Sequence, residues 1–127
     1  MSSARPTRLV LVVDDNALNC RLMALVLQSR GLEVETVGSA EEALVFMQTR
    51  TPGVILLDLQ LPGMSGFDLL RLIRHDPATA RLPVLAVTAC AMKGDEQRAL
   101  AAGFDAYVTK PIDTRAMPTL VARWLGE

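Results

Sequence analysis

Five short apolar runs, separated by segments with helical spacing, constrain the fold of this chain more than any other feature. The runs are Leu9–Val13, Val34–Val37, Val54–Leu57, Val84–Val87 and Ala106–Val108. Four of them are continuous or nearly so, as in strands that are buried on both faces of a sheet. The second run lies in a stretch where charged and apolar residues alternate, which predicts an edge strand with one face in water. Because strand and helix alternate five times, we expect an α/β fold with a doubly wound parallel sheet, five helices and right-handed crossovers.

Helical spacing and capping residues define the segments between these runs. In the first helix, the apolar residues Leu18, Leu22, Leu25 and Val26 share one face, which we expect to be buried, and Gly31 is expected to end the helix. Three further helices have recognisable ends. The second helix begins at Ser39, which has capping-box spacing with Glu42, and the third begins at Ser65, which caps it together with Asp68. The fourth runs from near Met92 to Ala102 and ends at Gly103.

The fifth helix has an irregular beginning. If Asp113 caps it, Pro118 falls just beyond the positions whose N–H groups are free, so we expect this helix to begin late.

Length and charge exclude several classes of protein. The 127 residues fit one domain, which we place at residues 9–127 after a short tail at residues 1–8. The net charge is −1, and without a basic excess we expect no direct contact with nucleic acid. No apolar run reaches the roughly 18 residues of a membrane span, and Leu9–Val13 is too short for a signal peptide. We therefore expect a cytoplasmic protein that does not bind membranes.

The cysteines and the histidine offer little chemistry by their spacing. Cys20 and Cys90 show no metal-binding pattern, and we expect two unpaired thiols. His75 is the only histidine of the chain, and we expect it at the surface because it has no second histidine with which to share a metal ion.

Reactive side chains follow four of the five apolar runs. They are Asp14 and Asp15 after the first, Asp58 after the third, Thr88 after the fourth, and Thr109 and Lys110, followed by Pro111, after the fifth. In an open parallel sheet these positions meet at the carboxyl ends of the strands, where ligands bind. Three neighbouring carboxylates repel one another, and a hard cation such as Mg²⁺ would offset that repulsion. The backbone carbonyl of Gln60 is a further candidate ligand.

Asp58 is the best candidate for a nucleophile, because it lies on the central strand between the acidic pair and the residues after the fourth and fifth runs. An aspartate attacks a phosphoryl group to form an acyl phosphate, and the transfer needs positioning and charge stabilisation above all. Lys110, one of only two lysines in the chain, would supply a positive charge, and Thr88 a hydroxyl donor. We therefore predict a phosphate acceptor at Asp58.

Four segments together resemble the receiver domain of bacterial two-component response regulators. They are Val12–Asn16, Leu56–Gly66, Val87–Ala89 and Ala106–Pro111. Each segment alone is common, but all four in order, each at a strand end, are specific, and the resemblance covers the chain after Arg8. It implies a flavodoxin-like sheet with strand order 2-1-3-4-5.

The resemblance also implies roles for the residues of the site. Asp58 is the phosphorylated residue, Asp15 and Asp58 contact Mg²⁺ directly, Asp14 acts through water, and Gln60 uses its backbone carbonyl. Lys110 pairs with the phosphoryl group, and Thr88 moves toward it. Tyr107 rotates inward as the coupled switch, although a half-buried aromatic on an edge strand is the alternative for this residue. The Lys110–Pro111 peptide bond is expected to be cis.

The partners implied are a histidine kinase or a histidine phosphotransfer protein, and a downstream target on the face of the fourth helix, fifth strand and fifth helix. Asp15–Asn19 and Ala91–Glu96 resemble both stand-alone single-domain regulators and the receivers of hybrid kinases, so an excised receiver stays an alternative. A receiver-like scaffold that needs no phosphate is another. A Mg²⁺-dependent phosphohydrolase is disfavoured, because Asn16 stands two residues after Asp14, where such an enzyme needs an acid. We expect a signalling domain and not an enzyme.

Overall fold

A single parallel sheet forms the centre of the molecule. The computed structural model describes residues 8–89 and 93–126, and its five strands are β1 (Leu9–Val13), β2 (Glu33–Val37), β3 (Val54–Asp58), β4 (Val84–Thr88) and β5 (Ala106–Thr109). Every neighbouring pair is parallel, and the order across the sheet is β2-β1-β3-β4-β5. The predicted strands and their order are confirmed, and the predicted tail at residues 1–8 lies outside the described residues except for Arg8.

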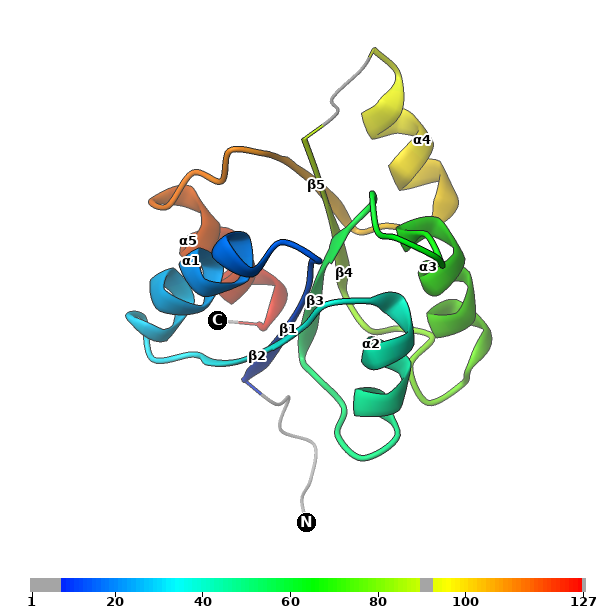
Figure 1. Cartoon of the computed structure of the whole chain (residues 1–127), viewed down its shortest axis with the longest axis horizontal. Coiled ribbons are helices and arrows are strands. Elements are labelled where there is room, and N and C mark those ends of the chain that lie inside the picture. The colour runs from blue at the N-terminus through cyan, green and yellow to red at the C-terminus, as the bar shows by residue number, and fades with distance from the viewer. Residues whose placement is uncertain (1–7, 90–92, 127) are drawn as a thin grey trace.

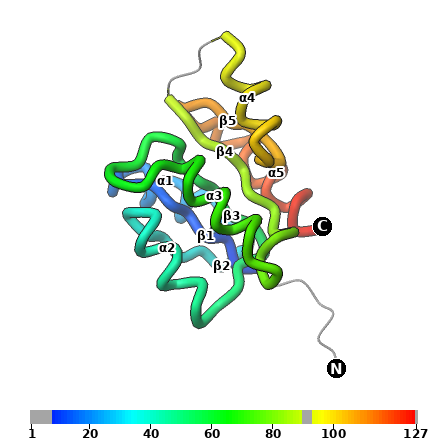
Figure 2. The backbone as a smooth tube through the Cα atoms, turned by 90° about the vertical axis from the view of Figure 1, so that its right-hand side faces the viewer, coloured from blue at the N-terminus to red at the C-terminus, as the bar shows by residue number. Residues whose placement is uncertain are grey.

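The helices cover the two faces of this sheet (Figure 1). They are α1 (Ala17–Gln28), α2 (Ala40–Met47), α3 (Gly66–His75), α4 (Asp95–Ala102) and α5 (Ala116–Trp124). Helices α1 and α5 lie on one face, and α2, α3 and α4 on the other. Figure 2 shows from the side that α4 lies beside β5, far from α2. No described helix is long and apolar enough to cross a bilayer.

Two aliphatic cores lie between the layers. All residues of β1, β3 and β4 are buried, and alternate side chains along each strand enter opposite cores. In β2, Val34 is buried between the exposed Glu33 and Glu35, as expected for an edge strand. Strands buried on both faces have no room for polar side chains along their length, so polar groups collect at their ends.

The predicted buried face of α1 is wrong. Leu18, Leu22 and Leu25 are 76%, 41% and 61% exposed, whereas Met23 and Leu27 are buried against the sheet. Apolar residues surround most of this helix, so the sequence contains two stripes with helical spacing, and packing against β1 and β2 selects the other one. The helix also ends earlier than predicted: its last residue is Gln28 and its C-cap is Ser29. Gly31, with a φ of 81°, lies in the turn that follows, where the N–H of Leu32 donates to the carbonyl of Leu27.

The first residues of α2 and α4 differ in detail from the prediction. The hydroxyl of Ser39 accepts from the N–H of Glu42, but the Glu42 carboxylate accepts from Gly38, one residue before the cap. Helix α4 begins at Asp95, later than predicted, and the expected start at Met92 falls on residues that are not described.

Helix α5 begins late, as expected. Asp113 accepts from the N–H groups of Arg115 and Ala116, and Pro118 is the third residue of the helix, where it costs no hydrogen bond.

Candidate functional site

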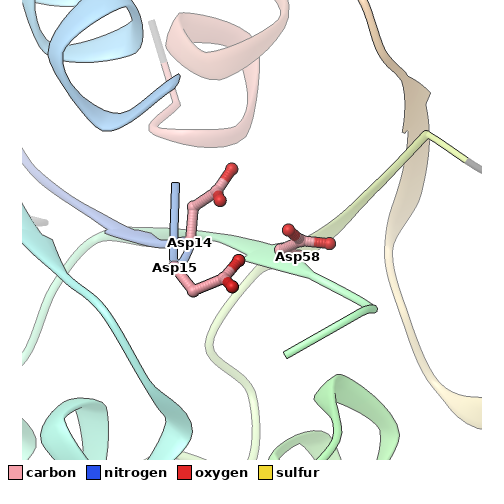
Figure 3. Close-up of side chains that lie close together, drawn as sticks. All are labelled: Asp14, Asp15 and Asp58. Atoms are coloured by element: carbon pink, nitrogen blue, oxygen red, sulfur yellow. The ribbon is translucent and has the colours of Figure 1, made fainter. Parts of the chain in front are cut away.

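The carboxyl ends of β1, β3 and β5 bring two buried carboxylates and one ammonium group together. The Nζ atom of Lys110 lies 3.0 Å from Oδ2 of Asp14 and 3.0 Å from Oδ2 of Asp58. Asp15 follows Asp14 on the exposed side and extends toward Asp58 (Figure 3). The predicted convergence of these four residues is therefore present, and the Lys110–Pro111 bond is cis as expected.

Hydrogen bonds to the backbone hold the two buried carboxylates in place. Oδ1 of Asp14 accepts from the N–H of Asn16 at 2.9 Å, and Oδ1 of Asp58 accepts from the N–H of Gln60 at 2.9 Å. In each case the carboxylate bonds the backbone two residues ahead, the turn that aspartate forms readily after a strand. One oxygen of each carboxylate thus positions the side chain, and the other faces Lys110.

Burial and hydrogen bonding have opposite effects on the pKa values of Asp58 and Lys110. Burial raises the pKa of Asp58 above its ordinary value, although the hydrogen bonds from Gln60 and Lys110 oppose the shift. Burial disfavours the charged form of Lys110, but hydrogen bonds to Asp14 and Asp58 outweigh it and raise the pKa of the ammonium group. The site therefore contains a carboxylate whose charge is incompletely compensated.

Three carboxylates offer a set of ligands for a hard cation. Oxygen atoms of Asp14, Asp15 and Asp58, one from each, all lie within 4.8 Å of one another. Oxygen donors of this kind suit Mg²⁺, which keeps several waters and needs an open side. Asp15 is exposed and supplies that side, whereas Asp14 and Asp58 are buried. The residues present fit the predicted ion.

Thr88 and Tyr107 lie next to this cluster on β4 and β5. Thr88 is buried at the end of β4, and its carbonyl accepts from the N–H of Lys110 at 2.8 Å. Tyr107 is half-buried on β5 and packs against the core beneath α3 and α4. Both residues stand where the sequence placed them. The structure contains one state of the chain, so their predicted movements stay predictions.

Gly66 is a position of the candidate site that side-chain chemistry did not reveal. A Cβ atom at Gly66, the first residue of α3, would lie 2.7 Å from the carbonyl oxygen of Asp58 and 2.9 Å from Cα of Leu59. Only a glycine allows α3 to approach the backbone of the candidate phosphate acceptor so closely. The available signal was the glycine directly after Ser65, at a predicted helix start.

Cys20 touches the site from α1. Its Sγ atom donates to the carbonyl of Asp14 at 3.2 Å, and burial, reinforced by the charge of Asp14, raises the pKa of the thiol. Cys20 is a free cysteine, as expected from the sequence. Cys90 lies outside the described residues, and His75 is exposed as predicted.

Comparison with known proteins assigns this combination of sheet and site. Residues 10–122 match the model of the response regulator receiver domain. The chain is 37% identical over 121 residues to the polar-differentiation response regulator DivK of Brucella ovis, an alignment that covers 95% of this chain and 98% of DivK.

Solved structures show the same relation. Chemotaxis protein CheY4 of Vibrio cholerae superposes with a TM-score of 0.85 at 28% identity, covering 92% of this chain and 98% of that one. The signal receiver domain of a signal transduction histidine kinase from Syntrophus aciditrophicus gives the same TM-score and identity, with coverages of 93% and 89%. The family match, the sequence identity and the fold agree, and the chain belongs to the receiver domains of two-component response regulators.

Proposed function

We propose that Asp58 accepts a phosphoryl group from a histidine kinase or a histidine phosphotransfer protein, and that the domain acts as a signalling switch and not as an enzyme. The observation that carries the proposal is the position of Lys110, whose Nζ atom bonds Asp14 and Asp58 at 3.0 Å each. An ammonium group at this point stands ready to pair with an oxygen of a phosphoryl group on Asp58. The cytoplasmic location expected from the sequence is part of the same proposal.

Mg²⁺ would be held by Asp15, by Asp58 and by the backbone carbonyl of Gln60, with Asp14 acting through water. Asp14 and Asp15 are the adjacent pair that follows β1, and of these two only Asp14 is buried. Asp15 is exposed and is therefore the better direct ligand of the pair. When bound, the ion would offset the negative charge that the site gathers during transfer.

The transfer requires one bond to form and one to break. A carboxylate oxygen of Asp58 attacks phosphorus while the bond from phosphorus to the donor's leaving atom breaks, which gives an acyl phosphate. Lys110 stabilises one phosphoryl oxygen, and the hydroxyl of Thr88 donates to another. The Asp58 side chain is held by Gln60, so the nucleophile is oriented before the donor arrives.

The phosphoryl group would then change the surface near β5. Thr88 is drawn toward the new oxygens, and Tyr107, two residues before Thr109, the register partner of Thr88, turns into the space that Thr88 leaves. We propose that the face of α4, β5 and α5 thereby changes its affinity for a downstream protein. In physical terms this is a shift between two populated states of one fold.

The exposed leucines of α1 suggest where the phosphate donor docks. Leu18, Leu22 and Leu25 form an apolar stripe on the helix that directly follows Asp14 and Asp15. Three exposed leucines at helical spacing fit a groove between the helices of a partner. We propose that this stripe positions the donor's phosphohistidine over Asp58.

Labelling with acetyl phosphate tests the acceptor. The wild-type chain should gain one phosphoryl group in the presence of Mg²⁺, and Asp58→Asn should abolish the gain, as read by intact mass spectrometry. Asp68→Asn is the matched control, because Asp68 is an exposed aspartate at the start of α3. Undiminished labelling of Asp58→Asn would refute the assignment.

Partner capture with and without beryllofluoride, a mimic of the phosphoryl group, tests the switch. A changed affinity supports it, and identical affinities would favour the scaffold that needs no phosphate.

A further inference from the structure

A recess with cationic residues on its rim opens beside the candidate phosphate acceptor on the side of α4. Its volume is about 440 Å³, and its walls include Leu59 and Phe67. Gln60 and Thr88 also line it, and these two residues flank Asp58 in space: Gln60 bonds the Asp58 carboxylate, and Thr88 ends the adjacent strand. The recess therefore begins where a phosphoryl group on Asp58 would stand.

The rim of this recess carries a net positive charge. Lys93 is exposed, and it is the only lysine of the chain besides Lys110. The Arg98 side chain is 73% exposed, and its Nη2 atom lies 3.1 Å from Oδ1 of Asp95. Two cations and one carboxylate leave the rim with an excess of one positive charge, and neither cation has a role in the proposed transfer.

The cavity on the opposite side of the site has a different charge. It lies between α1 and β2, has a volume of about 470 Å³ and is lined by Asp14, Asp15, Glu42 and Arg21, among others. Three carboxylates and one guanidinium make it acidic. A Mg²⁺ ion at the aspartates would bring it close to neutral, but not to a positive charge. An anionic leaving group that departs from phosphorus as Asp58 attacks is therefore better accommodated on the side of α4.

We propose that the recess binds the leaving group of acyl phosphates, and that Lys93 and Arg98 are specificity-determining residues that favour these donors over phosphorylated nitrogen bases. The inference rests on the proposed function of Asp58. In the step concerned, an oxygen of Asp58 bonds to phosphorus and the bond between phosphorus and the acyl oxygen breaks. Its electron pair leaves with the carboxylate, and no proton is transferred.

The charge of the leaving group separates the two classes of donor. A carboxylate gains a full negative charge as the bond breaks, and Lys93 and Arg98 would stabilise that charge in the transition state. A phosphorylated imidazole that carries a proton on its other nitrogen leaves as a neutral ring when the bond between phosphorus and nitrogen breaks, so the two cations offer it little. Leu59 and Phe67 would contact the small apolar part of either group.

The experiment measures labelling rates with two small donors, acetyl phosphate and N-phosphoimidazole, at saturating Mg²⁺. The variants are Lys93→Met, Arg98→Gln and the double variant. The matched control is Arg71→Gln, because Arg71 pairs with Asp68 at the same i,i+3 spacing and its side chain is 74% exposed. Since both donors deliver the same phosphoryl group to Asp58, the ratio of their rates reports on the leaving group alone.

We expect the rate with acetyl phosphate to fall roughly threefold for each charge removed, as for one unit charge acting over ~6 Å in a water-like medium. The rate with N-phosphoimidazole should stay within about twofold, and this unchanged rate also shows that the variants are folded. High salt should reduce the preference of the wild type and leave the double variant unaffected.

Three results would overturn the inference: an unchanged ratio in the double variant, an equal loss with both donors, or an equal loss in Arg71→Gln. In each of them Asp58 is still labelled, so the proposed function survives. Failure of the wild type to be labelled by either donor would instead remove the proposed function, and the inference with it.

Discussion

The substitution Gly66→Ala tests how closely the fold constrains the candidate phosphate acceptor. The added Cβ atom would lie 2.7 Å from the carbonyl oxygen of Asp58 and 2.9 Å from Cα of Leu59, whereas ordinary contacts begin near 3.4 Å. Both neighbours are backbone atoms, so no flexible side chain can move aside. The first turn of α3 and the end of β3 must therefore separate by about 0.5–0.7 Å.

Overpacking of this kind costs about 2 kcal/mol, which corresponds to a decrease in Tm of roughly 6–10 °C for a domain of this size. Alanine is a better helix former than glycine, so helix propensity alone predicts the opposite sign. A displacement of a few tenths of an ångström at the nucleophile should also slow labelling of Asp58 about tenfold, since a misplacement of 1 Å costs on the order of a hundredfold.

Thermal unfolding and the labelling rate with acetyl phosphate, measured well below the Tm of the variant, check the two parts. Gly38→Ala is the control, because Gly38 also lies at the rim of the site, but its nearest neighbour would be a Glu42 oxygen at 3.8 Å. Wild-type Tm and labelling rate in Gly66→Ala would refute the reasoning, since they would show that α3 moves away without consequence.

Two further predictions concern charges. Arg74 donates hydrogen bonds to three backbone carbonyls and to Asp105. The substitution Arg74→Met should therefore reduce the free energy of unfolding, measured in urea, by about 2–3 kcal/mol, whereas Arg71→Met should change it by less than about 0.5 kcal/mol. Equal losses in the two variants would contradict this prediction. Burial raises the pKa of the Asp58 carboxyl group in the folded chain. This group therefore stabilises the fold below the pKa that it has in the unfolded chain, and the contribution is lost as the pH rises through its pKa in the folded chain. Asp58→Asn should therefore raise the Tm of the metal-free protein at pH 7, with a gain that shrinks toward pH 4; a constant gain would contradict the linkage.

The strands could be predicted because burial on both faces leaves a pattern that few other structures share. Val54–Asp58 and Val84–Thr88 are continuous apolar runs that end in a polar residue, and the structure begins and ends both strands within one residue of the prediction. The same continuity located the site, since Asp58 and Thr88 are the first positions at which a polar group is tolerated. Fold and site were thus predicted from one feature.

The face of α1 could not be predicted from its own residues. Leu18, Leu22 and Leu25 satisfy helical spacing as well as Met23 and Leu27 do, and only the sheet decides which set is buried. The structural roles of Gly66 and Arg74 could not be predicted for a related reason. The role of Gly66 depends on a backbone that approaches from β3, and that of Arg74 on carbonyls supplied by two distant connections. Interactions of this kind leave no periodic pattern in the sequence.

The position of the site also indicates where a phosphoryl group on Asp58, as proposed above, would change the surface. Strands β3 and β4 are buried on both faces, so Asp58 and Thr88 are fixed by aliphatic packing below them and can respond only at their side chains. Helix α4, in contrast, buries only Ala99 among its eight residues, and β5 has three half-buried residues and an exposed Thr109. Local stability follows buried apolar contact, so the response to a new charge is expected to concentrate in α4 and β5. The rigid centre of the sheet would thus direct the proposed change outward, toward α4 and β5.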